Sequence, residues 1–174
     1  MRNLTTLKGK PTIYGILLII GGFLHLFVPV WGIVIPEPIN YAAFFWYWGF
    51  YFQSSSGNID TGIIGNEQWL FAGRTAMTLM IICFVILLIT LVLARAFKIF
   101  ETEKNITIFG IVWLITGILM LIAPSIYVIE LNDVIFDEDV WGIGIYMSYG
   151  FAIIPLILGI ILLYSKMKGE KIGT

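Results

Sequence analysis

Side chains that commonly carry catalysis or bind metals are scarce in this 174-residue sequence, which has one histidine, His25, and one cysteine, Cys83. A single histidine cannot supply bis-histidine haem ligation or a histidine-rich metal site from one chain. A single cysteine cannot form an intrachain disulfide. The sequence also shows no nucleophile–base pair and no phosphate-binding loop. These gaps argue against an enzyme, so we predict no catalytic residues, no metal site and no cofactor.

His25 and Arg74 stand inside long apolar stretches of the sequence. A histidine buried in a membrane is a functional hypothesis by default, but a neutral imidazole that donates to a neighbouring carbonyl is the simpler interpretation. For Arg74 we predict an anchor, whose guanidinium binds backbone carbonyls or a carboxylate and ties an outer loop to the helices. The alternative for Arg74 is a site for an anion or a substrate.

An acidic cluster near residue 135 offers oxygen ligands that a hard cation such as calcium prefers. Its members are Asp133, Asp137, Glu138 and Asp139. Their spacing does not match an EF-hand loop, so we interpret them as a solvated acidic rim. No paired carboxylates lie within the apolar stretches, although proton-coupled transporters use such pairs.

The composition requires lipid as the solvent for most of the chain, because 59% of the residues are hydrophobic and the mean hydropathy is +0.96. A helix needs about 20 apolar residues to cross a hydrocarbon core of about 30 Å. Four stretches meet this requirement, at about 12–34, 70–94, 106–129 and 141–164. We therefore predict a single four-span domain over residues 1–174, with outer loops at 35–69 and 130–140.

The charges predict how the spans are oriented. Apart from Arg74, every lysine and arginine falls within 2–10, 95–104 or 166–171, and the remaining loops are acidic. The positive-inside rule then places both termini and the short middle loop in the cytoplasm of a multi-pass cell-membrane protein. The net charge of −1 gives no case for nucleic-acid binding.

The first outer loop is rich in aromatic residues of high β propensity between 41 and 52. The segment 53–58 predicts a turn, and a second β-like run follows around 59–64. We expect a small extracellular β-sheet whose aromatic face rests on the membrane surface or on the helices; the alternative is an aromatic helix lying flat on the lipid. Trp31, at the end of the first span, is placed where an interfacial belt aromatic belongs.

Short motifs in the first half of the chain resemble the claudin superfamily, which comprises claudins, peripheral myelin protein and calcium-channel gamma subunits. Val28-Pro29-Val30-Trp31 resembles the claudin Leu-Pro-x-Trp at the same place. Trp46-Tyr-Trp-Gly-Phe-Tyr-Phe-Gln53 is similar to Trp-x-x-Gly-Leu-Trp, with Gly49 at the glycine and Tyr51 at the second tryptophan. Leu70-Phe-Ala-Gly-Arg-Thr-Ala76 resembles Leu-Gln-Ala-Ala-Arg-Ala-Leu, which places Arg74 on the family arginine.

Motifs in the second half continue the resemblance. Residues 117–127 are similar to the claudin Gly-Leu-Leu-Thr-Leu-x-x-x-Ser-Trp-Tyr, and residues 141–149 resemble Phe-Gly-x-x-Leu-Tyr-x-Gly-Trp. The resemblance implies an all-α membrane protein, a four-transmembrane-helix bundle with a small extracellular β-sheet built from the first outer loop and the end of the third span. It implies structural or interface roles for Trp31, Trp46, Trp48, Gly49, Tyr51, Arg74, Tyr127, Gly142 and Tyr146.

One departure from the family bears on function. Claudins hold their outer sheet with a disulfide, and this chain has no cysteine in that loop, with Ser54 standing about where the first would fall. A disulfide contributes roughly 2–4 kcal/mol, so the loop must be held by its aromatic residues and by Arg74. This departure puts a tight-junction barrier or pore in doubt, and a distant prokaryotic or archaeal relative fits better.

Three functions follow as expectations. The first is a non-enzymatic structural or interaction protein, claudin-like, that forms homo-oligomers laterally or across membranes through the aromatic outer loop. The alternative is an accessory subunit of a larger membrane complex, such as a channel, a transporter or a membrane enzyme. The third is a small enzyme or transporter, which the scarcity of polar groups in the apolar stretches disfavours. The expected partners are thus the lipid bilayer and either the chain itself or a larger membrane protein.

Overall fold

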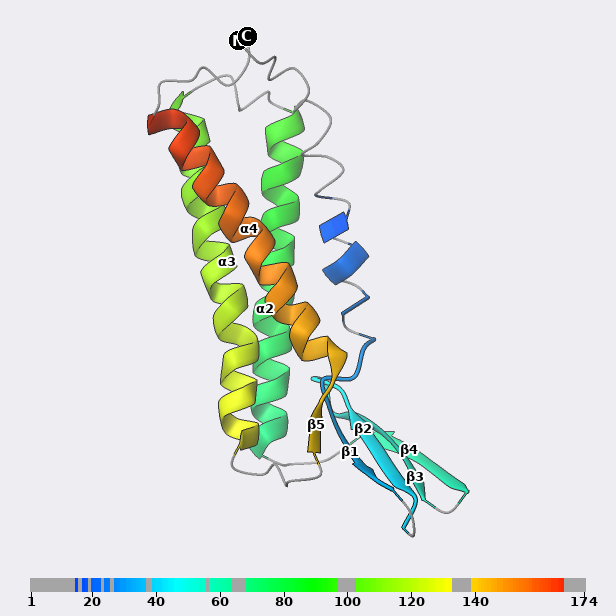
Figure 1. The fold of residues 1–174 in the computed structure, drawn as a ribbon. Coiled ribbons are helices and arrows are strands. Elements are labelled where there is room, and N and C mark those ends of the chain that lie inside the picture. The colour runs from blue at the N-terminus through cyan, green and yellow to red at the C-terminus, as the bar shows by residue number, and fades with distance from the viewer. Residues whose placement is uncertain are drawn as a thin grey trace.

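Three long helices form the body of the protein (Figure 1). The computed structural model describes residues 15–167 except 16, 19, 23, 26, 37–38, 56, 64–67, 97–102 and 133–138. Helices α2 (Gln68–Ala96), α3 (Glu103–Asn132) and α4 (Ile143–Met167) each contain an apolar stretch long enough to cross a membrane, at Leu70–Ala94, Asn105–Leu131 and Ile143–Tyr164. The second, third and fourth predicted spans agree with these stretches to within about two residues. The chain is therefore an integral membrane protein with three candidate spans in its described part.

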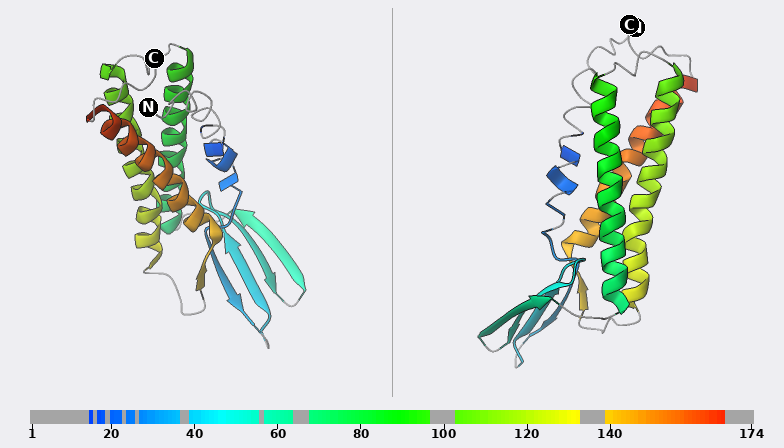
Figure 2. Two further views of the ribbon diagram at one scale, coloured as in Figure 1. Left: turned by 45° about the horizontal axis from the view of Figure 1, so that its top comes forward. Right: turned by 180° about the vertical axis from the view of Figure 1, so that it is seen from behind.

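Helix α3 packs extensively against α4 and also against α2 (Figures 1 and 2). Proline interrupts α3 at Pro124 and α4 at Pro155, where the missing N–H leaves a carbonyl of the preceding turn without its helical donor. One hydroxyl pair lies beside the first proline: the Ser125 Oγ donates to the Leu121 carbonyl at 2.8 Å and lies 3.1 Å from the Tyr149 hydroxyl of α4. Polar side chains thus join the two helices beside this proline.

The first predicted span is described only in part, and its predicted end is wrong. Its described residues are helical as far as His25, and the chain then turns at Phe27 and Val28. Residues Trp31–Ile35 form strand β1 instead of helix, although we expected the span to continue to residue 34. The physical reason is Pro29, which cannot donate to a helix, followed by a β-branched run that pairs with a neighbouring strand.

Glycines place the helical part of this segment against the bundle. A Cβ atom at Gly21 would lie 2.0 Å from the Phe151 ring of α4, and one at Gly22 would lie 2.7 Å from the Phe84 ring of α2. Only residues without a side chain allow such an approach. The segment before β1 therefore lies close to both α2 and α4.

A five-stranded antiparallel sheet extends sideways and away from one end of the helices (Figures 1 and 2). Its strand order is β4-β3-β2-β1-β5, in which β2 spans Tyr41–Phe45, β3 Phe50–Ser55, β4 Asn58–Ile63 and β5 Asp139–Trp141. The four consecutive strands are a meander, and β5 pairs with β1 through Trp31 opposite Trp141. These strands exclude the alternative of an aromatic helix lying on the lipid.

Three details of the predicted sheet differ from the structure. The fifth strand comes from the segment just before α4, whereas we expected the end of the third span; α3 remains helical to Asn132, so the predicted outer loop at 130–140 begins later. The aromatic run between 41 and 52 is not one strand but two, because the chain turns at residues 46–49. The turn predicted at 53–58 is correspondingly shorter, because β3 continues to Ser55 and β4 begins at Asn58.

Side chains divide the sheet into two faces, because cross-strand partners point to the same side. One face, here called the bundle face, meets the helices: Trp31 and Ala43 are buried, and Phe45 packs against the core. The opposite face, here called the free face, carries residues that the register aligns with one another: Val34, Ala42, Phe44, Phe50, Phe52, Ser54, Ile59, Thr61 and Ile63.

Candidate functional site

A buried polar cluster, here called the polar junction, joins the sheet to the helices. It consists of His25, Tyr47, Ser148 and Tyr127, which come from the helical segment before β1, the β2–β3 turn, α4 and α3. The His25 Nε2 contacts the Ser148 Oγ, and the Tyr47 hydroxyl lies 3.0 Å from the same Oγ. The Tyr47 ring lies 5.4 Å from the His25 ring and 5.0 Å from the Tyr127 ring, centroid to centroid. Three separate parts of the chain therefore meet at one hydroxyl, and α3 joins them through the contact between the Tyr127 and Tyr47 rings.

The hydrogen bonds of the polar junction define where its protons lie. The Ser148 hydroxyl donates to the Gly144 carbonyl of its own helix at 2.7 Å. The Ser148 oxygen can then accept two hydrogen bonds. One comes from the Tyr47 hydroxyl, and the other comes from the His25 Nε2–H when the neutral ring carries its hydrogen on Nε2. Burial raises the pKa of the Tyr47 phenol above its ordinary value, so this hydroxyl stays protonated and able to donate. In this arrangement His25 is a neutral imidazole with a bare Nδ1.

Two polar atoms of the polar junction lack partners in the part of the chain that the structure describes. They are the His25 Nδ1 and the Tyr127 hydroxyl, and both are fully buried. Ser148 is also fully enclosed, and its proton is already bonded to a carbonyl. A serine beside a histidine can be a nucleophile and its base, and here both side chains are fully buried.

Local backbone requirements explain why the sheet meets the helices at this place. Gly49 has φ +90° in the β2–β3 turn, and a Cβ atom there would lie 2.3 Å from the Leu70 side chain of α2. Gly142 donates its N–H to the Val30 carbonyl at 3.0 Å, and a Cβ atom there would lie 2.2 Å from the Pro29 carbonyl oxygen. Gly142 thus allows two backbones to approach closely, and Gly49 allows the β2–β3 turn to lie against the Leu70 side chain.

Three aromatic residues stack at the bundle end of the free face. Trp46 meets Phe50 edge-on at 5.0 Å between centroids, and Trp48 lies parallel to Phe50 at 5.2 Å. These rings remain only half-buried. The turn that holds Tyr47 inward in the polar junction thus presents both predicted tryptophans on the other side.

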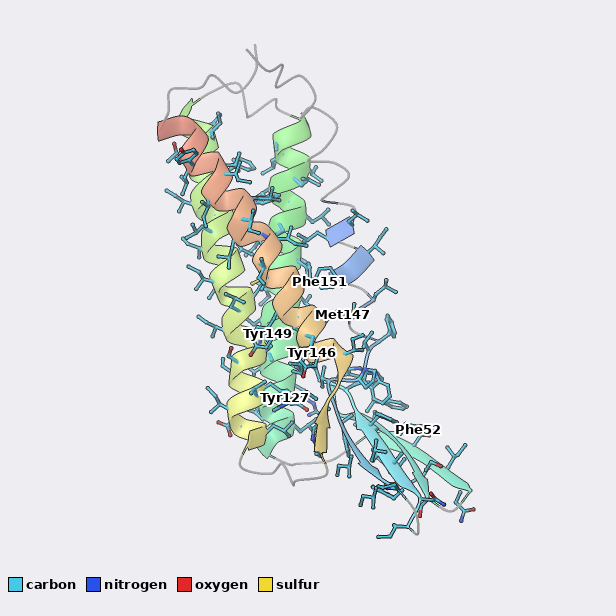
Figure 3. The ribbon with its side chains drawn as sticks, in the orientation of Figure 1. Phe52, Tyr127, Tyr146, Met147, Tyr149 and Phe151 are labelled. Carbon is cyan, nitrogen blue, oxygen red and sulfur yellow. The ribbon has the colours of Figure 1, made fainter. Side chains whose placement is uncertain are left out.

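The free face continues outward from these rings as an apolar surface. Ile59 and Ile63 are 68% and 66% exposed, although both are large apolar residues. None of the free-face side chains, all of which the structure describes, belongs to the hydrophobic core. Figure 3 shows Phe52 in the sheet, well apart from Tyr127 at the helices. Scattered exposed apolar residues are common, but these apolar residues lie side by side on neighbouring strands of one sheet face.

The bundle face turns polar with distance from the helices. The Asp60 carboxylate accepts hydrogen bonds from the Tyr51 hydroxyl at 3.0 Å and from the Gln53 amide at 3.2 Å. Tyr41 donates to the same Gln53 at 3.4 Å. This polar ladder fixes the outer half of β3 and β4 and leaves the two faces of the sheet chemically different.

The remaining predicted site residues lie apart from the polar junction. Trp31 is buried, 5% exposed, and stacks on Phe45 at 4.1 Å, so its predicted position in an interfacial belt is wrong; the strand turns its ring toward the core. Tyr146 is exposed on the first turn of α4 (Figure 3). Arg74 is exposed on α2 and has no ion pair with any residue the structure describes, so its predicted anchoring of the loop stays a prediction.

His25 and the acidic cluster complete the comparison with the sequence. The His25 partner is the Ser148 hydroxyl, whereas we expected a backbone carbonyl. Three of the four acidic residues near 135 lie outside the described residues, and Asp139 begins β5. Among described residues no group of three histidines, cysteines or carboxylates could hold a metal ion.

Sequence reasoning missed Tyr47 and Ser148, the two residues that complete the polar junction. Ser148 is 123 residues from His25 and 101 from Tyr47, so no local spacing connects them. The one feature of the sequence that could have pointed to Ser148 is its polarity, because its side chain places a hydroxyl group inside a largely apolar stretch.

Comparisons with models of known protein families and with curated proteins find no match for this chain.

Proposed function

We propose that this chain is a non-enzymatic integral membrane protein, claudin-like in architecture, that associates with further copies of itself through the free face of its sheet. The observation that carries the proposal is the apolar, uncharged free face held outside the bundle. A monomer gains nothing from displaying aromatic and β-branched residues on the sheet face that does not touch its own core. Aromatic residues are enriched where protein interfaces bury their centres.

The polar junction supports an interaction role because it makes the sheet a rigid extension of the bundle. A binding face costs less to order when its scaffold is already fixed. The enclosure of Ser148 and His25 is the reason to prefer this role to catalysis. The motif resemblance to claudins and the sheet next to apolar helices agree with each other. In this proposal the polar junction and the polar ladder around Asp60 hold the sheet in place of the missing disulfide.

Adjacent residues on opposite faces provide the test. Phe52 points to the free face and Gln53 to the bundle face, so Phe52→Ser removes apolar contact area while Gln53→Ser is a control on the same strand. We expect photo-crosslinking in native membranes, with a reagent that does not react through lysine amines, to yield dimers and larger multimers for the wild type and the control. We expect at least a severalfold loss for Phe52→Ser. Equal crosslinking of the two variants would show that the free face is not part of the interface.

A further inference from the structure

Arg74 lies on the strip of α2 that faces away from the rest of the protein. The strip follows helical spacing through Phe71, Arg74, Thr78, Ile82 and Val85, and all five are exposed. Phe71 is 76% exposed and Ile82 is 50% exposed. The opposite strip of the helix is buried, and its members are Ala72, Ala76, Met80, Cys83 and Leu87. Since α2 crosses the membrane, the exposed strip that carries Arg74 faces lipid.

The depth of Arg74 places its guanidinium at the level of lipid headgroups. The apolar stretch Leu70–Ala94 has 25 residues, which at 1.5 Å per residue gives about 37 Å, longer than a hydrocarbon core of about 30 Å. Arg74 is four residues, or about 6 Å, from the start of this stretch. Helical side chains lean toward the N-terminus of their helix, which for α2 is the end that bears the sheet. A long arginine side chain therefore reaches the interface of that leaflet.

Arg74 has no protein acceptor among the residues that the structure describes. The carboxylates whose side chains the structure describes are Asp60, which accepts from Tyr51 and Gln53, and Glu130, and neither forms an ion pair with Arg74. The nearby Thr78 hydroxyl donates to the Arg74 backbone carbonyl at 2.8 Å and leaves the guanidinium uncovered. Arginine is always charged and presents five N–H donors, and leaving them without an acceptor beside lipid is unfavourable.

We propose that Arg74 is a binding site for a phosphate group of a membrane lipid, in the leaflet on the sheet side. A guanidinium matches a phosphate with two parallel hydrogen bonds, and phosphodiesters are the anionic acceptors present at this depth. The other nine lysines and arginines fall within 2–10, 95–104 and 166–171, outside the segments that form the sheet and its connections to the helices. Arg74 would thus fix one lipid beside the sheet, independently of whether the free face binds another copy.

Native mass spectrometry of the full chain in detergent tests the site. The probes are phosphatidylglycerol and a diacylglycerol with the same acyl chains, which differ by the phosphoglycerol headgroup. We expect the wild type to hold one more phosphatidylglycerol than Arg74→Gln, whose affinity for that lipid falls about tenfold or more, since charge-assisted hydrogen bonds carry that much. Arg74→Lys should retain part of the affinity, and the control Thr75→Gln, which adds the same side chain next to Arg74, should retain all of it.

Three results would overturn the proposal. Phosphatidylglycerol could bind Arg74→Gln as tightly as it binds the wild type, which would place the lipid elsewhere. Millimolar inorganic phosphate could displace the lipid fully, which would make this a site for a free anion. Finally, selective binding could appear only in Glu67→Gln, which would show that a carboxylate of the chain already holds Arg74. Unchanged circular dichroism of Arg74→Gln will confirm that a lost lipid does not reflect unfolding.

Discussion

At the scale of single residues, the stability of the sheet's attachment depends on one hydroxyl. Ser148 accepts hydrogen bonds from Tyr47 and His25 while it donates to its own helix. All three side chains are buried, so each lost bond leaves a polar atom that water cannot reach.

Ser148→Ala tests this dependence. The substitution leaves the Tyr47 hydroxyl and the His25 Nε2 without acceptors, and we expect a loss of about 2–3 kcal/mol in unfolding free energy. The same variant should make the β2–β3 turn more sensitive to proteases. Ser125→Ala is the control, because Ser125 bonds a less buried hydroxyl between α3 and α4 and should cost about 1 kcal/mol. Denaturant titration in detergent measures both, and equal losses would show that Ser148 has no special position.

The Tyr51–Asp60 pair predicts a pH dependence in the outer half of the sheet. The hydrogen bond to Asp60 raises the pKa of the Tyr51 phenol above its ordinary value of 10.0. Because the pKa of Tyr51 is raised in the folded protein, the hydrogen bond stabilises the sheet fully at pH values below the ordinary tyrosine pKa. This stabilisation is lost as the pH rises through the raised pKa of the folded protein. We expect ¹³C-labelled tyrosine spectra to show Tyr51 titrating above pH 10.0, identified by Tyr51→Phe, and Asp60→Asn to lower that midpoint. A midpoint unaffected by Asp60→Asn would exclude the pair.

At the scale of elements, the β2–β3 turn is the part that aligns the sheet with α2. Gly49 and Gly57 both have positive φ, +90° and +86°, but they differ in their surroundings. A Cβ atom at Gly49 would meet Leu70, whereas one at Gly57 would meet nothing within 4 Å. The two glycines therefore separate backbone strain from steric contact.

Alanine at each glycine measures these two costs. Gly57→Ala should destabilise the protein by about 1 kcal/mol, which is the cost of the left-handed backbone alone. Gly49→Ala should cost about 1–3 kcal/mol more, because the new methyl group also displaces Leu70. Thermal unfolding in detergent compares the two variants. If they are equally stable, the turn does not press against α2 as the structure indicates.

The elements also show what the sequence could and could not predict. The limits of the α2 span follow from a long, uniform apolar run, and the β-rich outer loop follows from its aromatic composition. Trp31 misled the prediction because a tryptophan after an apolar stretch suits a membrane interface as well as a strand, and only pairing with β2 and β5 decides between them. The polar junction could not be predicted, because its members are distant in sequence and meet only after the helices pack.

At the scale of the whole molecule, the protein is a helical body with apolar spans and a sheet that lies beyond one end of the helices (Figure 2). Near the helices, the bundle face of that sheet packs against the protein's own core. Farther out, the same face carries the polar ladder around Asp60. The free face is apolar and is not used internally. This asymmetry is the physical basis for proposing self-association.

Native mass spectrometry of tagged protein, extracted gently from its own membrane, tests the central claim most directly. Self-association predicts multiples of 19.6 kDa with no other protein bound, and a shift to the monomer in Phe52→Ser but not in Gln53→Ser. A monomer in the wild type, or a stoichiometric larger partner that remains bound in Phe52→Ser, would contradict it; the second result would make the chain an accessory subunit.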